Sequence, residues 1–314
     1  MTSNHPASQL QDLTTEAINP ESEEIDTLSS LEIVRLINAQ DADVPTAVGR
    51  EAQNIATAVD VITDRLRNGG RLLYLGAGTS GRLGVLDASE CPPTFSTPPE
   101  MVVGIIAGGY SALHSAAEGV EDEPGTAVED LKSHGLSGRD VLVGIATSGR
   151  TPYVIGGLEF ARRTGAYAIG LTCNVNSALE AAADLVIAPI VGPEVITGST
   201  RMKAGTATKL VLNMLTTGTM VRLGKTFGNL MVDLKATNTK LTARARRLAA
   251  QLTGLSEENV AQYLTACNGE LKTTIVSVRC DLTPDDARQR LREAKGQLRV
   301  ALRGCAAVAS KTPS

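Results

Sequence analysis

The sequence contains no tryptophan and has little aromatic character of any kind. Phe, Trp and Tyr together make up 3% of its 314 residues. Surfaces that bind single-stranded nucleic acid stack the bases on aromatic rings, so this composition argues against such a surface. The formal net charge of −4 provides no general attraction to nucleic acid or to an anionic membrane. We therefore expect neither nucleic acid nor a membrane as a partner.

Cysteine and long apolar runs are scarce as well. The five cysteines are odd in number and form no C-x-x-C pair, which argues against a disulfide framework and favours a reducing compartment. The first 24 residues lack the apolar core of a signal peptide, and no apolar run approaches the length needed to span a membrane. These features predict a soluble, cytoplasmic protein.

Short apolar runs alternate with helical patterns from residue 71 onward. The apolar runs span 71–75, 101–106, 140–146, 166–172 and 185–190, and helical patterns lie between them at 80–89, 111–119, 152–164 and 177–183. Continuous apolar strands that alternate with helices indicate a parallel sheet covered on both faces. We expect an α/β/α sandwich whose five-stranded parallel sheet has the order 2-1-3-4-5.

Helical segments flank this sheet in the sequence. The predicted organisation is a flexible polar stretch at 1–24, an N-terminal helical extension at 25–54, the sheet domain at 55–225 and a small helical domain at 240–303. Ser29 and Glu32 have the spacing of a capping box, which predicts that the extension opens with a helix.

Two turns rich in glycine and hydroxyl groups follow the first and third predicted strands. Such a turn at a helix start directs backbone N–H groups and the positive end of the helix dipole at one point, which suits a phosphate. Strands one and three are neighbours at the switch point of a 2-1-3-4-5 sheet, so the two turns should meet. The predicted phosphate-binding residues are Gly78, Thr79, Ser80, Thr147, Ser148, Gly149, Arg150 and Thr151.

We expect neither a metal nor a redox cofactor. His5, His114 and His134 are scattered without the spacing of metal ligands. The G-x-G-x-x-G run at 76–81 matches the dinucleotide fingerprint, but Ala-Gly-Gly follows the strand at 101–106, where that fingerprint requires a carboxylate for the ribose. A phosphate carried by a sugar fits the additional hydroxyl groups better.

Five longer blocks carry a resemblance that extends from about residue 14 to residue 303. They are GAGTSGRLG with DASECPPT at 76–94, EGVED at 118–122, ATSGRTPY at 146–153, VITGSTRMKAGT at 195–206 and FGNLMVD at 227–233. With these blocks the sequence resembles the N-acetylmuramic acid 6-phosphate etherase family, within the sugar isomerase (SIS) fold group. Its departures are small, such as Val120 and a longer polar N-terminus.

The resemblance implies a carbon–oxygen lyase of amino sugar catabolism and peptidoglycan recycling. It would cleave the D-lactyl ether of N-acetylmuramic acid 6-phosphate by elimination and water addition, giving N-acetylglucosamine 6-phosphate and D-lactate without a cofactor. The family's catalytic pair falls on Glu90, as the acid at the leaving oxygen, and Glu121, as the base at carbon 2. Expelling an alkoxide requires an acid and removing a carbon-bound proton requires a base. The resemblance also suggests a homodimer with pockets near the subunit interface.

Some assignments stay open at this point. Glu118 competes with Glu121 for the role of the base because it lies in the same block. Ser199, Arg201 and Lys203 are candidate substrate-binding residues, although Arg201 and Lys203 are equally well explained by structural salt bridges. The rival functions are an aldose–ketose isomerase on the same sheet and a non-catalytic sugar-phosphate sensor.

Overall fold

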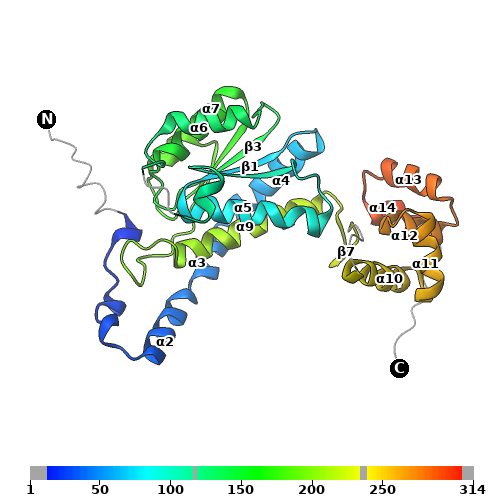
Figure 1. Cartoon of the computed structure of the whole chain (residues 1–314), viewed down its shortest axis with the longest axis horizontal. Helices are drawn as coiled ribbons and strands as arrows, with labels where there is room; N and C mark the ends of the chain where they lie inside the picture. The colour runs from blue at the N-terminus through cyan, green and yellow to red at the C-terminus, as the bar shows by residue number, and fades with distance from the viewer. Residues whose placement is uncertain (1–12, 116–118, 234–238, 306–314) are drawn as a thin grey trace. The chain divides into compact units, whose positions relative to one another are not determined.

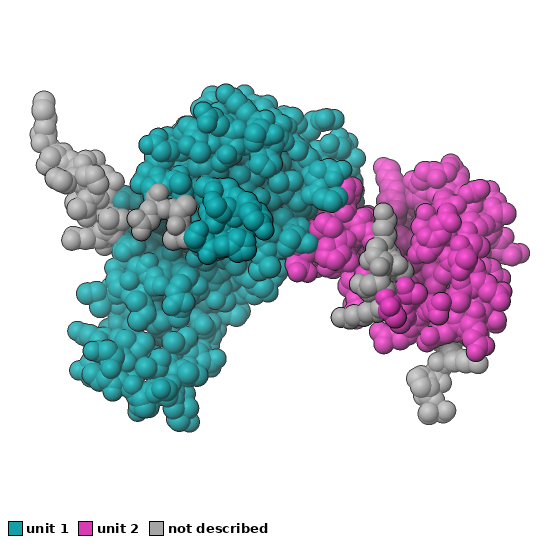
Figure 2. Space-filling view, viewed as in Figure 1, with its two compact units in different colours: residues 1–89, 99–216 teal, residues 90–98, 217–314 magenta. Residues whose placement is uncertain are grey.

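The computed structural model describes residues 13–115, 119–233 and 239–305 (Figure 1). The chain divides into two compact units, residues 1–89 with 99–216 and residues 90–98 with 217–314 (Figure 2). The first unit holds the large sheet and the second holds the C-terminal helices.

The first unit is built on a five-stranded parallel sheet, and its predicted order is confirmed. The strands are β2 (Val102–Ile106), β1 (Leu72–Gly76), β3 (Val141–Ile145), β4 (Tyr167–Leu171) and β5 (Leu185–Ile187), in that spatial order. Every residue of β1 and β3 is buried, which explains their continuous apolar sequence. Gly76 pairs with Ile145, so β1 and β3 end side by side.

Helices cover both faces of this sheet, as predicted for an α/β/α sandwich. Figure 1 shows α6 (Pro124–Ser133) and α7 (Pro152–Thr164) on one side and α5 (Gly78–Phe95) and α9 (Lys203–Arg222) on the other. The short α8 (Ala178–Ala182) joins α6 and α7 in one apolar core with β1 and β3. The helix α4 (Ala52–Arg67) contacts β5.

The connection between β2 and β3 differs from the prediction. The helix predicted at 111–119 is wrong, because the described residues there form only a 3-10 turn, η4 (Tyr110–Leu113). Gly108 and Gly109 have positive φ, which turns the chain after β2. The crossover helix is α6, whose sequence contains too few apolar residues to show a clear helical period.

The N-terminal part of the first unit begins with 3-10 turns η1 (Thr14–Glu16), η2 (Pro20–Ser22) and η3 (Ile25–Thr27). The helices α2 (Ser30–Asp41) and α3 (Val44–Arg50) follow. The predicted capping box is confirmed, because the side chains of Ser29 and Glu32 each accept from the other's backbone N–H. The sequence predicts a flexible stretch over 1–24, and the structure buries Thr15 and Asn19 within it.

The second unit contains the helices α10 (Thr239–Thr253), α11 (Glu257–Ala266), α12 (Leu271–Cys280), α13 (Pro284–Glu293) and α14 (Leu298–Ala301), with the hairpin β6–β7 (Thr226–Phe227 and Leu230–Met231). Ser256 and Thr283 cap α11 and α13 through side-chain hydrogen bonds. Leu248, Val260 and Ile275 belong to its own apolar core.

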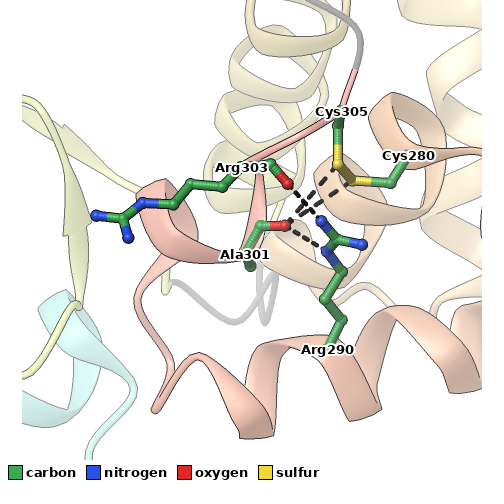
Figure 3. Close-up of a disulfide and its surroundings, with 5 residues drawn as sticks. All are labelled: Cys280, Arg290, Ala301, Arg303 and Cys305. Carbon is green, nitrogen blue, oxygen red and sulfur yellow. Dashed lines mark hydrogen bonds between the residues drawn. A yellow bond between two sulfur atoms is a disulfide. The ribbon is translucent and has the colours of Figure 1, made fainter.

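A disulfide joins Cys280 to Cys305, so the expectation that no cysteines pair is wrong for these two (Figure 3). They lie 25 residues apart in the sequence, and α13 and α14 bring the chain back to the end of α12. Arg290 supports the returning segment by donating to the carbonyl groups of Ala301 and Arg303. Sequence spacing alone does not reveal this proximity.

Candidate active site

The turn after β1 packs tightly against the start of α5. A Cβ atom on Gly76 would lie 2.7 Å from the backbone nitrogen of Gly81, and one on Gly81 would lie 2.6 Å from the carbonyl oxygen of Gly76. Only glycine fits at both positions, and Gly78 also has a φ of +52°. The close fit holds the first turn of α5, including the buried Ser80, at the carboxyl end of β1.

The turn after β3 is constrained in a similar way. Gly149 has a φ of +69°, and a Cβ atom there would lie 2.3 Å from the Cβ of Ser177. The Oγ of Ser148 accepts a hydrogen bond from the backbone N–H of Arg150 at 3.3 Å. Thr151 is the N-cap of α7 and Pro152 is its first residue, which places the α7 N-terminus beside this turn.

The start of α9 is held by a buried carboxylate. Glu194 is fully buried and accepts hydrogen bonds from the backbone N–H groups of Lys203 at 2.9 Å and Ala204 at 3.0 Å. Burial raises the pKa of Glu194, and these two hydrogen bonds oppose that effect. The carboxylate satisfies two N–H groups that the helix itself leaves unpaired.

A second buried carboxylate joins α5 to α9 and β1. Asp87 accepts hydrogen bonds from the Tyr74 hydroxyl at 2.9 Å, the Asn213 amide at 2.9 Å and the Thr216 hydroxyl at 3.2 Å. Burial raises the pKa of Asp87. Its position agrees with a structural role, since it fixes the helix that begins at the β1 turn.

These turns and helix starts enclose a cavity of about 230 Å³ at the carboxyl ends of β1 and β3. It is lined by Glu16, Ala77, Gly78, Thr79, Ser80, Leu83, Glu121, Ile145, Ala146, Thr147, Ser148, Thr151, Gly198, Thr200, Gly205 and Thr208. Helices α5 and α7 begin at or next to this lining, so two positive dipole ends lie beside one cavity, whereas the start of α9 is already capped by the Glu194 carboxylate. No lysine or arginine occurs among the described residues of the lining. The site is therefore suited to an anion held by neutral donors.

The structure brings most of the predicted phosphate-binding residues together with one of the predicted catalytic glutamates. Gly78, Thr79, Ser80, Thr147, Ser148, Thr151 and Glu121 all line the cavity. Gly149, Arg150, Ser199, Arg201, Lys203 and Glu90 are absent from the described lining. Lys203 is buried, and its Nζ donates to the Gln40 side chain at 3.1 Å. The roles assigned to these six residues, and to those that line the cavity, stay predictions.

Glu90 lies near the other end of α5. Ten residues separate it from Ser80, which corresponds to about 15 Å along a helix axis. Its side chain is exposed, and so is Leu86 one turn earlier. Glu118, the alternative base, lies outside the described residues.

Several residues of the cavity are absent from the sequence-based prediction. Gly198, Thr200, Gly205 and Thr208 come from the 195–206 block and the first turns of α9. The hydroxyl-rich composition of that block was a usable signal for them. Glu16 comes from η1, 60 residues before the first phosphate turn, and no local pattern indicates its position.

Comparisons with known proteins define the class of this protein first. The N-terminal SIS domain of glucokinase regulatory protein matches residues 54–162, and the SIS domain matches residues 127–218. Among solved structures, phosphoheptose isomerase GmhA from Neisseria gonorrhoeae is similar at 19% identity and a TM-score of 0.47, over 60% of this chain and 98% of that chain. The sheet order and the family matches define a SIS-domain protein.

Closer relatives identify the family. A protein named N-acetylmuramic acid 6-phosphate etherase from Rhodopirellula baltica is 62% identical over 92% of this chain and 96% of its own length. Proteins of the same name from Streptomyces avermitilis and Escherichia coli O6:K15:H31 are 55% and 53% identical, each over 94% of this chain. They are covered over 94% and 99% of their own lengths. The chain belongs to the N-acetylmuramic acid 6-phosphate etherase family.

The described residues provide neither a membrane-spanning helix nor a cluster of metal-ligating side chains. None of the described helices has the length and apolar content required to cross a membrane. The described part of the chain also contains no group of three or more His, Cys, Asp or Glu side chains that could hold a metal ion.

Proposed function

We propose that this protein is a carbon–oxygen lyase that cleaves the D-lactyl ether of N-acetylmuramic acid 6-phosphate, giving N-acetylglucosamine 6-phosphate and D-lactate. Relatives that match nearly the whole chain carry the name of this activity. The structural observation that supports it is the presence of Glu121 in the same cavity as the two phosphate-type turns. A sugar bound by its phosphate in these turns would have its ring carbons within reach of a carboxylate.

The proposed chemistry divides between a base and an acid. With the phosphate held by Ser80, Ser148 and neighbouring hydroxyl and N–H groups, Glu121 removes the proton from carbon 2 of the open-chain aldehyde. The electron pair forms the carbon 2–carbon 3 double bond and the ether bond between carbon 3 and oxygen breaks. Glu90 protonates the departing lactyl oxygen. Water then adds at carbon 3, and a proton returns to carbon 2.

Glu90 and the exposed apolar surface together support a homodimer. Leu31 and Val34 on α2 are 59% and 62% exposed, and α2 buries none of its residues within the described chain. Leu86, which shares a face of α5 with Glu90, is 52% exposed. Apolar patches of this kind are typical of contacts between subunits. We infer that a second copy covers these faces and supplies Glu90 to the cavity of its partner.

A complementation experiment tests this arrangement. Glu90→Gln and Glu121→Gln variants should each be inactive, whereas co-expression of both should restore about a quarter of the wild-type activity, since half of the dimers are hybrids with one intact site each. Absence of any restored activity in confirmed hybrids would mean that both glutamates act from the same chain.

The activity itself is tested by incubation with N-acetylmuramic acid 6-phosphate and measurement of free D-lactate. In deuterated water that carries an oxygen label, the sugar product should gain deuterium at carbon 2 and labelled oxygen at carbon 3, while lactate keeps its ether oxygen. Label in the lactate would refute cleavage between carbon 3 and oxygen. Interconversion of an aldose and a ketose without lactate would instead indicate an isomerase.

We further propose that residues 55–225 form the catalytic domain and that the protein acts in the cytoplasm, where such a sugar phosphate would be retained. Because disulfides are rare in a reducing compartment, a cytoplasmic location predicts that Cys280 and Cys305 are reduced in the cell and pair on oxidation. Fractionation of the native cells tests the location, and thiol labelling of the protein directly after lysis tests whether Cys280 and Cys305 are paired.

A further inference from the structure

The N-terminal segment, residues 13–22, is fastened to the turn after β3. The Thr14 hydroxyl donates to Asn174 Oδ1 at 2.9 Å, and the Asn174 amide donates to Thr15 Oγ1 at 3.1 Å. The same amide donates to the backbone carbonyl of Thr147 at 2.9 Å. Thr15 and Asn174 are both buried. One buried asparagine therefore couples the N-terminal segment to a phosphate-type turn of the cavity.

A second set of contacts fastens the other end of this segment. The buried Asn19 donates from its amide to Gln40 Oε1 at 2.9 Å, and Lys203 Nζ donates to the same oxygen at 3.1 Å. Lys203 is the first residue of α9, the helix that Glu194 caps. The segment is thus held at both ends by elements that also shape the cavity.

Glu16 lies between these two attachments and lines the cavity. Its carboxylate is close to Gly198, because a Cβ atom built on Gly198 would lie 3.0 Å from Glu16 Oε2. The Glu16 side chain makes no hydrogen bond or ion pair with any residue that the structure describes. Thr208, on the lining as well, is buried with its Oγ1 unpartnered among the described residues. Polar groups left unpartnered inside a cavity indicate where a ligand supplies the missing partners.

The chemistry of a carboxylate limits what Glu16 can bind. An ionised carboxylate only accepts hydrogen bonds, and it repels a phosphate dianion. The hydroxyl-rich turns at Ser80 and Ser148 suit the phosphate, so Glu16 suits a neutral donor on the same ligand. A sugar offers hydroxyl groups and, when it carries an acetamido group, an amide N–H.

We propose that Glu16 is a substrate-contacting residue that accepts a hydrogen bond from a hydroxyl or amide N–H of the sugar and thereby selects a sugar phosphate over phosphate alone. The identity of that sugar rests on the proposed function. Glu16 stands apart from the acid and base assigned above, because its role is recognition of the neutral part of the ligand.

Binding measurements on Glu16→Gln test this role, because the substitution should change the affinities for a sugar phosphate and for inorganic phosphate in opposite directions. Calorimetric titration with N-acetylglucosamine 6-phosphate should show affinity weakened about five- to tenfold, because the amide oxygen can still accept the hydrogen bond but no longer carries a charge. Inorganic phosphate should bind equally well or more tightly, because a repelling charge is removed. Glu23→Gln removes the same charge from an exposed position just after this segment and should change neither affinity.

Three other binding results would overturn the proposal. Equal weakening for both ligands would assign Glu16 a structural role in holding the N-terminal segment, and unchanged sugar-phosphate affinity would remove it from the ligand. Failure of wild type to bind either ligand would overturn it together with the phosphate site. Another outcome is that wild type binds both ligands yet releases no D-lactate, while Glu16→Gln weakens the affinity for the sugar phosphate but not for inorganic phosphate. In that case the lyase assignment would fail and the role of Glu16 would stand.

Discussion

The hydroxyl groups of the two turns should provide much of the affinity for the phosphate, and Ser80→Ala tests this directly. The described lining of the cavity contains no lysine or arginine, so no side-chain cation there compensates for a lost donor. A hydrogen bond to a charged group is worth about 1.5–3 kcal/mol. This range corresponds to an affinity loss of about ten- to a hundredfold. Ser148→Ala, on the turn after β3, should show a loss of the same order.

Calorimetric titration with N-acetylglucosamine 6-phosphate measures both variants. Ser133→Ala on α6 is the matched control, because its exposed hydroxyl contacts the carbonyl of Asp130 and the ring nitrogen of His134, and Ser133 is absent from the described lining of the cavity. The control should bind like wild type, and circular dichroism should show that all three variants are folded. Wild-type affinity in both Ser80→Ala and Ser148→Ala would refute the placement of the phosphate between β1 and β3.

Three further predictions concern stability and cofactors. Burial tends to raise the pKa of Asp140, but hydrogen bonds from Arg71 and from the backbone of Ser137 outweigh it and hold the pKa below its usual value. Asp140→Asn should therefore lower the free energy of unfolding by about 2–3 kcal/mol at neutral pH. This difference should shrink as the pH falls below about 4, because Asp140 takes up a proton there in the unfolded chain and only at lower pH in the native state; a constant difference down to pH 2 would contradict it. Cys280→Ser removes the disulfide that closes a loop of 25 residues, and it should destabilise the C-terminal unit by about 3.5 kcal/mol. In thermal melts, dithiothreitol should lower the melting temperature of wild type but not that of the variant. NAD should show no saturable calorimetric binding at micromolar concentration, because no carboxylate follows β2.

The sheet could be predicted closely because its sequence signals are local. Strands buried on both faces need continuous apolar runs, and β1 and β3 show this pattern over their full lengths. Capping residues such as Ser29 and Thr283 also act within one turn. The crossover helix α6 was missed because tertiary packing of Ala127 and Leu131, rather than a strong helical period, stabilises it. The disulfide was missed because only the folded helices bring its cysteines together.

The same distinction between local and distant contacts explains which residues of the site could be predicted from the sequence. The residues of both turns were predictable because glycine and hydroxyl patterns specify a turn, and the sheet order places the two turns together. The position of Glu16 was not predictable, and the residues at the start of α9 had only the hydroxyl-rich composition of their block as a signal, since hydrogen bonds through Asn174 and Glu194 fix where these segments lie. These contacts join segments up to 160 residues apart. The sequence of one segment does not indicate which distant segment it will contact.

A phosphate site made of neutral donors has a consequence for the carboxylates beside it. A lysine or arginine within a few ångströms of a carboxylate favours its ionised form and so makes it a weaker base. Hydroxyl groups, backbone N–H groups and helix dipoles can hold a phosphate with less of this effect. No lysine or arginine occurs in the described lining of this cavity, and Lys203 at the start of α9 donates its hydrogen bond to Gln40. In the proposed mechanism this arrangement separates anion binding from proton abstraction, so that one small cavity would hold a phosphate and still use Glu121 as a base.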